Sequence, residues 1–152
     1  EMVFVQRGVF RCSPEALFAF HERPDALALL SPKDGSVRVV KAPASLRVGE
    51  EAVLAVGFGP LRVTWLARHT VYDPPHRFVD SQLRGPYALW EHTHTFAPAG
   101  AGAVVMSDRV RYALPLLAPA WFVRRDLDRI FEYRARAIAR GVGAATVSGR
   151  VS

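Results

Sequence analysis

The feature that most constrains the fold of this chain is the run from residue 36 to residue 113, where short alternating segments are separated by glycine and proline. We expect six strands in this run, at residues 36–41, 50–57, 61–72, 77–84, 87–96 and 103–113. Glycine and proline end strands for steric reasons, and the connections between the segments are short. Because short connections make consecutive strands antiparallel, the run predicts an antiparallel meander.

A strand and two short helices are predicted before the meander. Residues 2–11 are rich in β-branched and aromatic residues, which favours a first strand. Ser13-Pro14-Glu15 then offers an N-cap serine, a proline suited to the first helical turn and an acid at the positive end of the helix dipole. We expect one short helix from about Pro14 and a second from Pro24 to the residue before Ser31.

After the meander, the sequence predicts a long amphipathic helix from Pro119 to Arg140, with Gly141 as the residue that ends it. A helix of about 21 residues is roughly 30 Å long, enough to cross a sheet. One face recurs at spacings of three and four residues and is apolar except for Arg134. This face consists of Val123, Leu127, Ile130, Phe131, Arg134 and Ile138.

Together these elements predict one α+β domain at residues 2–140, followed by a flexible tail at residues 141–152. No apolar run approaches the roughly 20 residues that span a bilayer, and the first residues lack a signal-peptide pattern. Cys12 is the single cysteine, so no internal disulfide can form. We therefore expect a cytoplasmic protein and leave open whether it forms a homodimer.

The net charge of +6 raises the question of nucleic-acid binding. The basic residues are nearly all arginines scattered along the chain, and only Lys33 and Lys41 are lysines. Where arginines are dense, at residues 124–140, acidic residues alternate with them, which is typical of a solvated, ion-paired helix face. Since aromatic residues for base stacking are not interleaved with this charge, we expect no nucleic-acid partner.

The most informative polar residues lie in the stretch from His76 to Phe96. Side chains alternate between the two faces of a strand, so Trp90, His92 and His94 share one face with Phe96. Two large aromatic residues on that face predict burial. The histidines should then lie in an apolar interior, where polar groups need partners.

Neighbouring strands add further polar groups to the same face. Asp80 and Gln82 alternate in phase with Phe78, and Asp108 alternates in phase with Tyr112. The patch has two interpretations: a set of anchors for the polar end of a ligand, or a buried network in which aspartates accept hydrogen bonds from histidines. A slip of one residue in strand register would turn the whole patch outward.

The spacing of His92 and His94 would also suit two metal ligands on one strand, with Asp80, Asp108 or His69 as the third. Two histidines at this spacing are common without a metal, so we expect neither a metal nor a cofactor.

Several short motifs carry a resemblance to a known superfamily. They are Ser13-Pro14-Glu15 with Phe18-Ala19-Phe20, Tyr72-Asp73-Pro74-Pro75-His76-Arg77-Phe78, Phe78-Val79-Asp80-Ser81-Gln82, Gly85-Pro86-Tyr87, Trp90-Glu91-His92-Thr93-His94-Thr95-Phe96 and Ser107-Asp108-Arg109-Val110. In these motifs and in its order of elements the chain resembles the START-like, helix-grip superfamily, also called SRPBCC, and specifically its ligand-binding SRPBCC domain branch. The superfamily includes polyketide cyclases, lipid carriers and birch-pollen-type allergens. The resemblance implies a curved seven-stranded antiparallel sheet, two short helices after the first strand, and a long C-terminal helix over the sheet.

The resemblance also implies a cavity between sheet and long helix that holds a lipid, polyketide or aromatic-like molecule. The expected ligand-binding residues are Trp65, Asp80, Gln82, Trp90, His92, His94, Phe96, Asp108, Tyr112, Leu127 and Phe131. One alternative is an enzyme of the cyclase or dehydrase type, in which His92 or His94 acts as acid–base. A weaker alternative is a co-chaperone-like module that uses the basic helix to contact another protein.

Overall fold

The structure, a computed structural model, describes residues 1–114, 118–142 and 150–151 and consists of one antiparallel sheet with helices on one side of it. Its strands are β1 (Met2–Phe10), β2 (Val37–Lys41), β3 (Glu51–Val56), β4 (Val63–Asp73), β5 (Arg77–Arg84), β6 (Leu89–Pro98), β7 (Val104–Ala113) and β8 (Arg150–Val151). Its helices are α1 (Pro14–His21), α2 (Ala26–Leu30), the 3-10 turn η1 (Gly59–Leu61) and α3 (Ala120–Val142).

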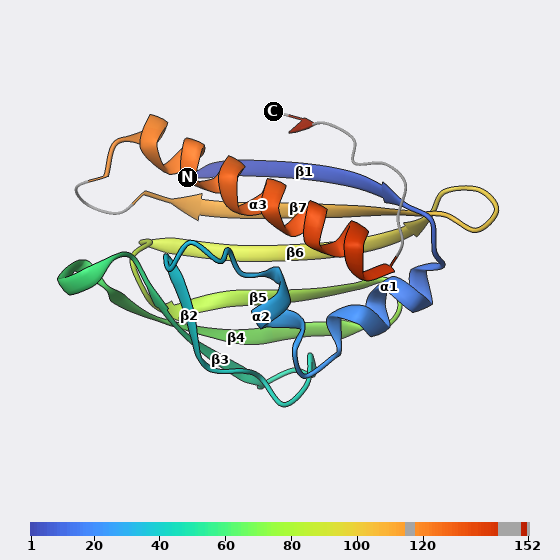
Figure 1. Cartoon of the computed structure of the whole chain (residues 1–152), viewed down its shortest axis with the longest axis horizontal. Coiled ribbons are helices and arrows are strands. Elements are labelled where there is room, and N and C mark those ends of the chain that lie inside the picture. Colours follow the sequence, from blue (N-terminus) through green and yellow to red (C-terminus); the bar gives the residue numbers. More distant parts are fainter. Residues whose placement is uncertain (115–117, 143–149, 152) are drawn as a thin grey trace.

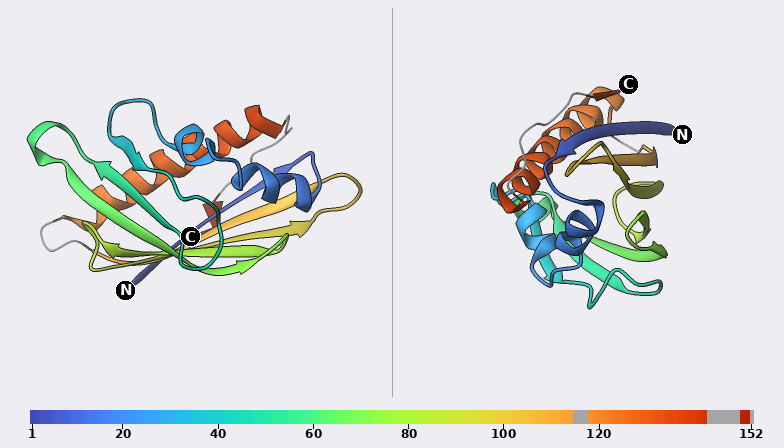
Figure 2. Two further views of the ribbon diagram at one scale, coloured as in Figure 1. Left: turned by 90° about the horizontal axis from the view of Figure 1, so that it is seen from below. Right: turned by 90° about the vertical axis from the view of Figure 1, so that its right-hand side faces the viewer.

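The sheet has the strand order β2-β3-β4-β5-β6-β7-β1-β8, so the meander is continuous and β1 adds to its far edge. Figure 1 shows α3 running across one face of the sheet, with α1 near its C-terminal end. Figure 2 shows that the sheet is curved and that the helices gather on one side of it. The predicted α+β helix-grip fold is confirmed, with the six predicted meander strands each within two residues of the observed bounds.

Helix α1 begins as the sequence indicates. The Ser13 hydroxyl accepts a hydrogen bond from the backbone N–H of Ala16 at 3.1 Å, and Pro14 occupies the first turn. The helix then buries Leu17, Phe18, Phe20 and His21 against the sheet. Its last turn therefore brings a histidine into the interior of the protein.

The C-terminal helix differs from the prediction at its end. Gly141 does not end α3, because the helix continues to Val142. A side-chain carbon at Gly141 would collide with the ring of Phe20, so this glycine permits close contact between α3 and α1. Gly141 therefore allows α3 to pack against α1, and it is not the residue that ends the helix.

The eighth strand was not predicted. Two of the described residues form it, and Val5 and Gln6 of β1 are its pairing partners. Two residues carry no readable alternation, which explains why the sequence gives no sign of it. The rest of the predicted tail, residues 143–149 and 152, lies outside the described residues. Within the described chain, no helix is long and apolar enough to cross a membrane.

The core consists of two apolar clusters separated by polar groups. The first lies near α1 and consists of Phe10, Leu17, Phe18, Phe20, Leu30, Leu46, Phe78, Phe96, Val104, Met106, Ala137 and Ile138. The second lies near the start of α3 and consists of Phe4, Trp90, Val110, Tyr112, Val123, Leu127 and Phe131. On β6 the buried side chains follow the order Trp90, His92, His94, Phe96, so the two histidines lie between the clusters.

Candidate functional site

A cavity of about 520 Å³ lies between the sheet and helices α2 and α3. Its walls come from α1, α2, strands β2 to β6 and α3, and they are mostly apolar. Representative apolar wall residues are Leu30, Leu54, Trp65, Trp90, Leu127 and Phe131. Cavities of roughly 300–1,000 Å³ with apolar walls and a few polar groups are typical of sites for small organic molecules.

The polar part of the wall is a cluster of two histidines and two aspartates. His92 donates from Nε2 to Asp108 Oδ1 at 2.7 Å, and His94 donates from Nε2 to Asp80 Oδ2 at 2.9 Å. The remaining nitrogens also face the acids: His94 Nδ1 lies 3.3 Å from Asp108 Oδ1, and His92 Nδ1 lies 4.0 Å from Asp80 Oδ2. The 3.3 Å contact is too poorly aligned for a hydrogen bond. Each imidazole is therefore held between two carboxylates.

Strand register explains this arrangement. Asp80 of β5 is directly opposite His92 of β6, and Asp108 of β7 is directly opposite His94. Since opposite residues in a sheet point to the same face, the polar side chains of β5, β6 and β7 lie next to one another on the inner face of the sheet. The two imidazole centroids lie 3.7 Å apart, and His94 stacks on Phe78 at 3.9 Å. The polar cluster is therefore packed and not loosely solvated.

The four groups perturb one another's proton affinity. Burial disfavours the charged form of His94, but its contacts with Asp108 and Asp80 outweigh burial and raise its pKa. For His92, burial and the neighbouring His94 lower the pKa. Burial would raise the pKa of Asp80, but the hydrogen bond from His94 and the nearby imidazoles lower it to about 2. The pKa of Asp108 is also lowered, because its contacts with both histidines outweigh burial. The arrangement favours ionised aspartates, a protonated His94 and a neutral His92.

The same cluster contains the groups that could hold a metal ion. Asp80, His92 and His94 each offer one ligand atom, and these atoms lie within 4.8 Å of one another. Asp108 would then orient both imidazoles, as carboxylates behind metal-bound histidines commonly do. Binding would require His94 to give up the proton that its two carboxylate neighbours favour. The expectation of no metal stays a prediction.

Seven of the eleven expected ligand-binding residues line the cavity. They are Trp65, Asp80, Trp90, His92, His94, Leu127 and Phe131. The face predicted for β6 is therefore the cavity face.

The other four do not line this cavity. The Gln82 amide donates to Tyr87 O at 2.7 Å and accepts from Tyr87 N at 3.2 Å, so it holds the β5–β6 connection. The Phe96 ring is covered by Phe18 of α1 at a centroid distance of 5.4 Å. The Gln82 amide and the Phe96 ring therefore contact other residues of the protein and do not face the cavity.

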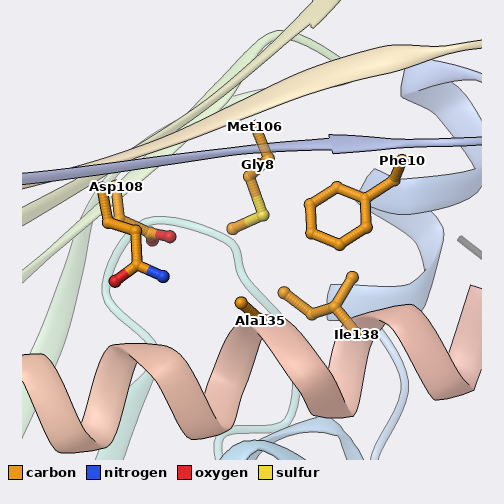
Figure 3. Close-up of a pocket in the computed structure, with 7 residues that line it drawn as sticks. Gly8, Phe10, Met106, Asp108, Ala135 and Ile138 are labelled. Atoms are coloured by element: carbon orange, nitrogen blue, oxygen red, sulfur yellow. The ribbon is translucent and has the colours of Figure 1, made fainter. Parts of the chain in front are cut away.

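Tyr112 and Asp108 are also placed behind the cavity wall. Tyr112 is buried in the second apolar cluster, with Tyr87 beside it at 6.1 Å between centroids. Asp108 lies behind the histidines and faces a small separate pocket of about 10 Å³. Figure 3 shows that pocket between the sheet, where β7 carries Met106 and Asp108 and β1 carries Phe10, and the helix that carries Ala135 and Ile138. Its size suits one water molecule and no larger ligand.

Several polar residues of the cavity wall are not among the expected binding residues, and His21, His69 and Arg134 are three of them. Alternation along β4 places His69 on the face of Trp65, a signal that could have been used. Arg134 interrupts the apolar stripe of α3, and the sequence alone shows this interruption. His21 could not be found from the sequence, because its direction depends on how α1 packs.

Comparison with known proteins identifies the family and supports the fold described above. The sequence profile of the family described as "Polyketide cyclase / dehydrase and lipid transport" matches residues 11–139. The chain belongs to this family. It therefore has the START-like, SRPBCC fold that the sequence motifs resemble. No protein of curated function matches the chain by sequence.

Solved structures show the same fold at low sequence identity. A nucleoside-diphosphate sugar epimerase from Corynebacterium glutamicum matches with a TM-score of 0.73 and 22% identity, over 90% of this chain and 28% of that one. This chain thus corresponds to less than a third of that protein. A START superfamily protein from Mycobacterium smegmatis matches with a TM-score of 0.69 and 11% identity, over 93% of this chain and 97% of that one. Norcoclaurine synthase from Thalictrum matches with a TM-score of 0.67 and 15% identity, over 93% of each chain.

Proposed function

We propose that this protein binds a hydrophobic or amphipathic small molecule in the cavity between the sheet and α3. The observation that carries the proposal is the cavity itself, about 520 Å³ that the protein's own side chains leave unfilled. Protein interiors are otherwise close-packed, and a large apolar cavity costs stability. The family's description, which names polyketide chemistry and lipid transport, is consistent with such a ligand.

The rim of the cavity supports entry of an apolar molecule. Phe58 and Leu61 from the β3–β4 connection, Val63 at the start of β4 and Phe122 from α3 all belong to the cavity wall and are all exposed. Leu61 is 80% exposed, and exposed apolar side chains grouped around a cavity are typical of ligand-binding grooves. An apolar rim lets a poorly soluble molecule keep favourable contacts as it enters.

A blocking substitution tests the proposal. Ala67 of β4 lines the cavity, so Ala67→Trp should fill part of it, whereas Ala97→Trp places the same side chain on an exposed position of β6. The neutral fluorescent dye N-phenyl-naphthylamine reports binding to apolar sites. We expect saturable binding of one dye to the wild type, a loss of about tenfold or more in Ala67→Trp, and no loss in Ala97→Trp. No saturable binding to the wild type, or equal affinity in both variants, would refute the proposal.

An enzyme of the cyclase or dehydrase type is the second candidate, because a protonated His94 beside the cavity could donate a proton to a bound molecule. Joint replacement of His92 and His94 by glutamine separates the two functions. Loss of turnover of a polyketide-like substrate with retained dye affinity would favour the enzyme. Loss of dye affinity with no turnover in the wild type would favour binding alone. Two expectations stay predictions: the cytoplasmic location and the lack of a nucleic-acid partner. Whether the protein forms a homodimer stays open.

A further inference from the structure

Arg134 differs from the other arginines of the cavity wall. Among the described residues, three arginines line the cavity, and two of them have carboxylate partners: Arg23 pairs with Asp25 at 2.7 Å, and Arg129 pairs with Asp34. Arg134 has no carboxylate within 4 Å among the residues that the structure describes, and its Nε is buried without a hydrogen-bond partner. A buried guanidinium nitrogen without a partner is costly, because it has lost its hydration and gained nothing in return.

Arg134 lines the cavity and is partly buried. It lies on the inward stripe of α3, between Phe131 and Ile138. Its guanidinium carbon lies 5.6 Å from the centroid of the Phe131 ring, which is itself part of the cavity wall. Burial is the main cause that lowers the pKa of His21 to about 4, and the positive charge of Arg134 lowers it further. Arg134 therefore packs against one cavity residue, Phe131, and its charge acts on a second, His21.

The acids of the cavity wall do not neutralise this charge. Asp80 accepts its hydrogen bond from His94, and Asp126 pairs with Arg129 at 2.8 Å. The third acid, Glu22, accepts a hydrogen bond from the Tyr72 hydroxyl at 2.7 Å. In the described part of the chain, the partner that would satisfy Arg134 is missing, while the cavity beside it has room for a ligand.

We propose that Arg134 binds an acidic group of the ligand, so that the cavity selects an amphipathic acid over a neutral molecule of the same shape. The acid would be a carboxylate or sulfonate on an apolar body, since the planar guanidinium can donate two parallel hydrogen bonds to either group. The apolar body would fill the space lined by Trp65, Trp90 and Leu127. This inference rests on the proposed function, because it names the class of molecule that the same cavity takes.

A matched pair of dyes tests the inference. N-phenyl-naphthylamine is neutral, and anilinonaphthalene sulfonate is the same molecule with an added sulfonate. Hydrogen bonds to charged groups contribute about 1.5–3 kcal/mol, which corresponds to roughly tenfold to a hundredfold in affinity. We therefore expect Arg134→Gln to weaken the sulfonated dye by about tenfold or more and to change the neutral dye by less than about twofold. Arg134→Lys, which keeps the charge but loses the planar fork, should retain part of the preference.

Arg23→Gln is the control, because it removes the same charge from an arginine of the wall that already has a carboxylate partner. It should leave the ratio of the two affinities unchanged. An unchanged ratio in Arg134→Gln, or an equal change in Arg23→Gln, would overturn the inference while the proposed function stood. If neither dye binds saturably to the wild type, the proposed function fails and the inference fails with it. The neutral dye also shows whether each variant keeps an intact cavity.

Discussion

His21 is a buried residue of α1, and replacing it with asparagine should weaken the dependence of stability on pH. The His21 Nδ1–H donates to Leu17 O at 2.8 Å, which fixes the neutral tautomer. Burial outweighs this bond and lowers the pKa of His21 from 6.5 to about 4. An asparagine side chain can place an N–H donor near the same carbonyl but cannot take up a proton in this range.

The sign and size of the effect follow from linkage. Between pH 6.5 and pH 4 the unfolded chain binds a proton at His21 and the folded chain does not, so stability falls as the pH falls. At 1.36 kcal/mol for each unit of pKa difference, the full interval corresponds to about 3 kcal/mol. His92 and His69 also have lowered pKa values, chiefly because of burial, and they steepen the same dependence. The difference between variant and wild type isolates the part that belongs to His21.

Urea unfolding followed by circular dichroism, at pH values from about 7.5 to 4.5, measures this difference. His21→Asn will be less stable at neutral pH, because the imidazole packs against Phe96 at 5.3 Å between centroids. Its further loss of stability on acidification should be smaller than that of the wild type by about 2–3 kcal/mol. His76→Asn, at an exposed histidine, should keep the wild-type slope. Equal slopes in His21→Asn and the wild type would show that His21 is not held neutral by burial.

Two further substitutions test the polar cluster and the packing of α3. Asp108→Asn should destabilise the protein by about 3 kcal/mol, because it leaves buried donors facing an uncharged group. Asp108 helps to raise the pKa of His94, so Asp108→Asn should also lower that pKa. NMR titration of the His94 imidazole measures it, and an unchanged pKa would contradict this prediction. Gly141→Ala should destabilise by about 1–3 kcal/mol although alanine favours helices, because the added carbon would meet the Phe20 ring. Unchanged thermal unfolding in Gly141→Ala would show that the ring can move aside.

Much of the polar cluster could be predicted from the sequence. The period of two along β6 places His92 and His94 with Trp90 and Phe96, and that period depends on backbone geometry alone. The short connections make β5, β6 and β7 antiparallel neighbours, so their polar residues had to meet if the register was right. The hydrogen-bond network of one interpretation is present, since the aspartates accept from the histidines. Three of the four groups line the cavity, and their role as anchors for a ligand stays a prediction.

Facing the interior does not by itself decide whether a side chain reaches a cavity. Phe96 shares its face with His94, but Phe18 of α1 covers it. Gln82 shares its face with Asp80, but its amide is used by the backbone of Tyr87. What covers each residue depends on elements distant in sequence, and periodicity contains no information about them.

By itself, the sequence determined the order of elements, the antiparallel meander and the inward face of β6, because alternation, glycine and proline breaks and helix caps act over a few residues. Only the tertiary structure decided that the interior stays open and that His21 enters it from α1. The tertiary structure alone decided that Arg134 meets no carboxylate from the described residues there. It also decided that α3 passes through Gly141 in contact with Phe20. These features depend on the distance between α3, α1 and the curved sheet, which is set by the packing of all three together.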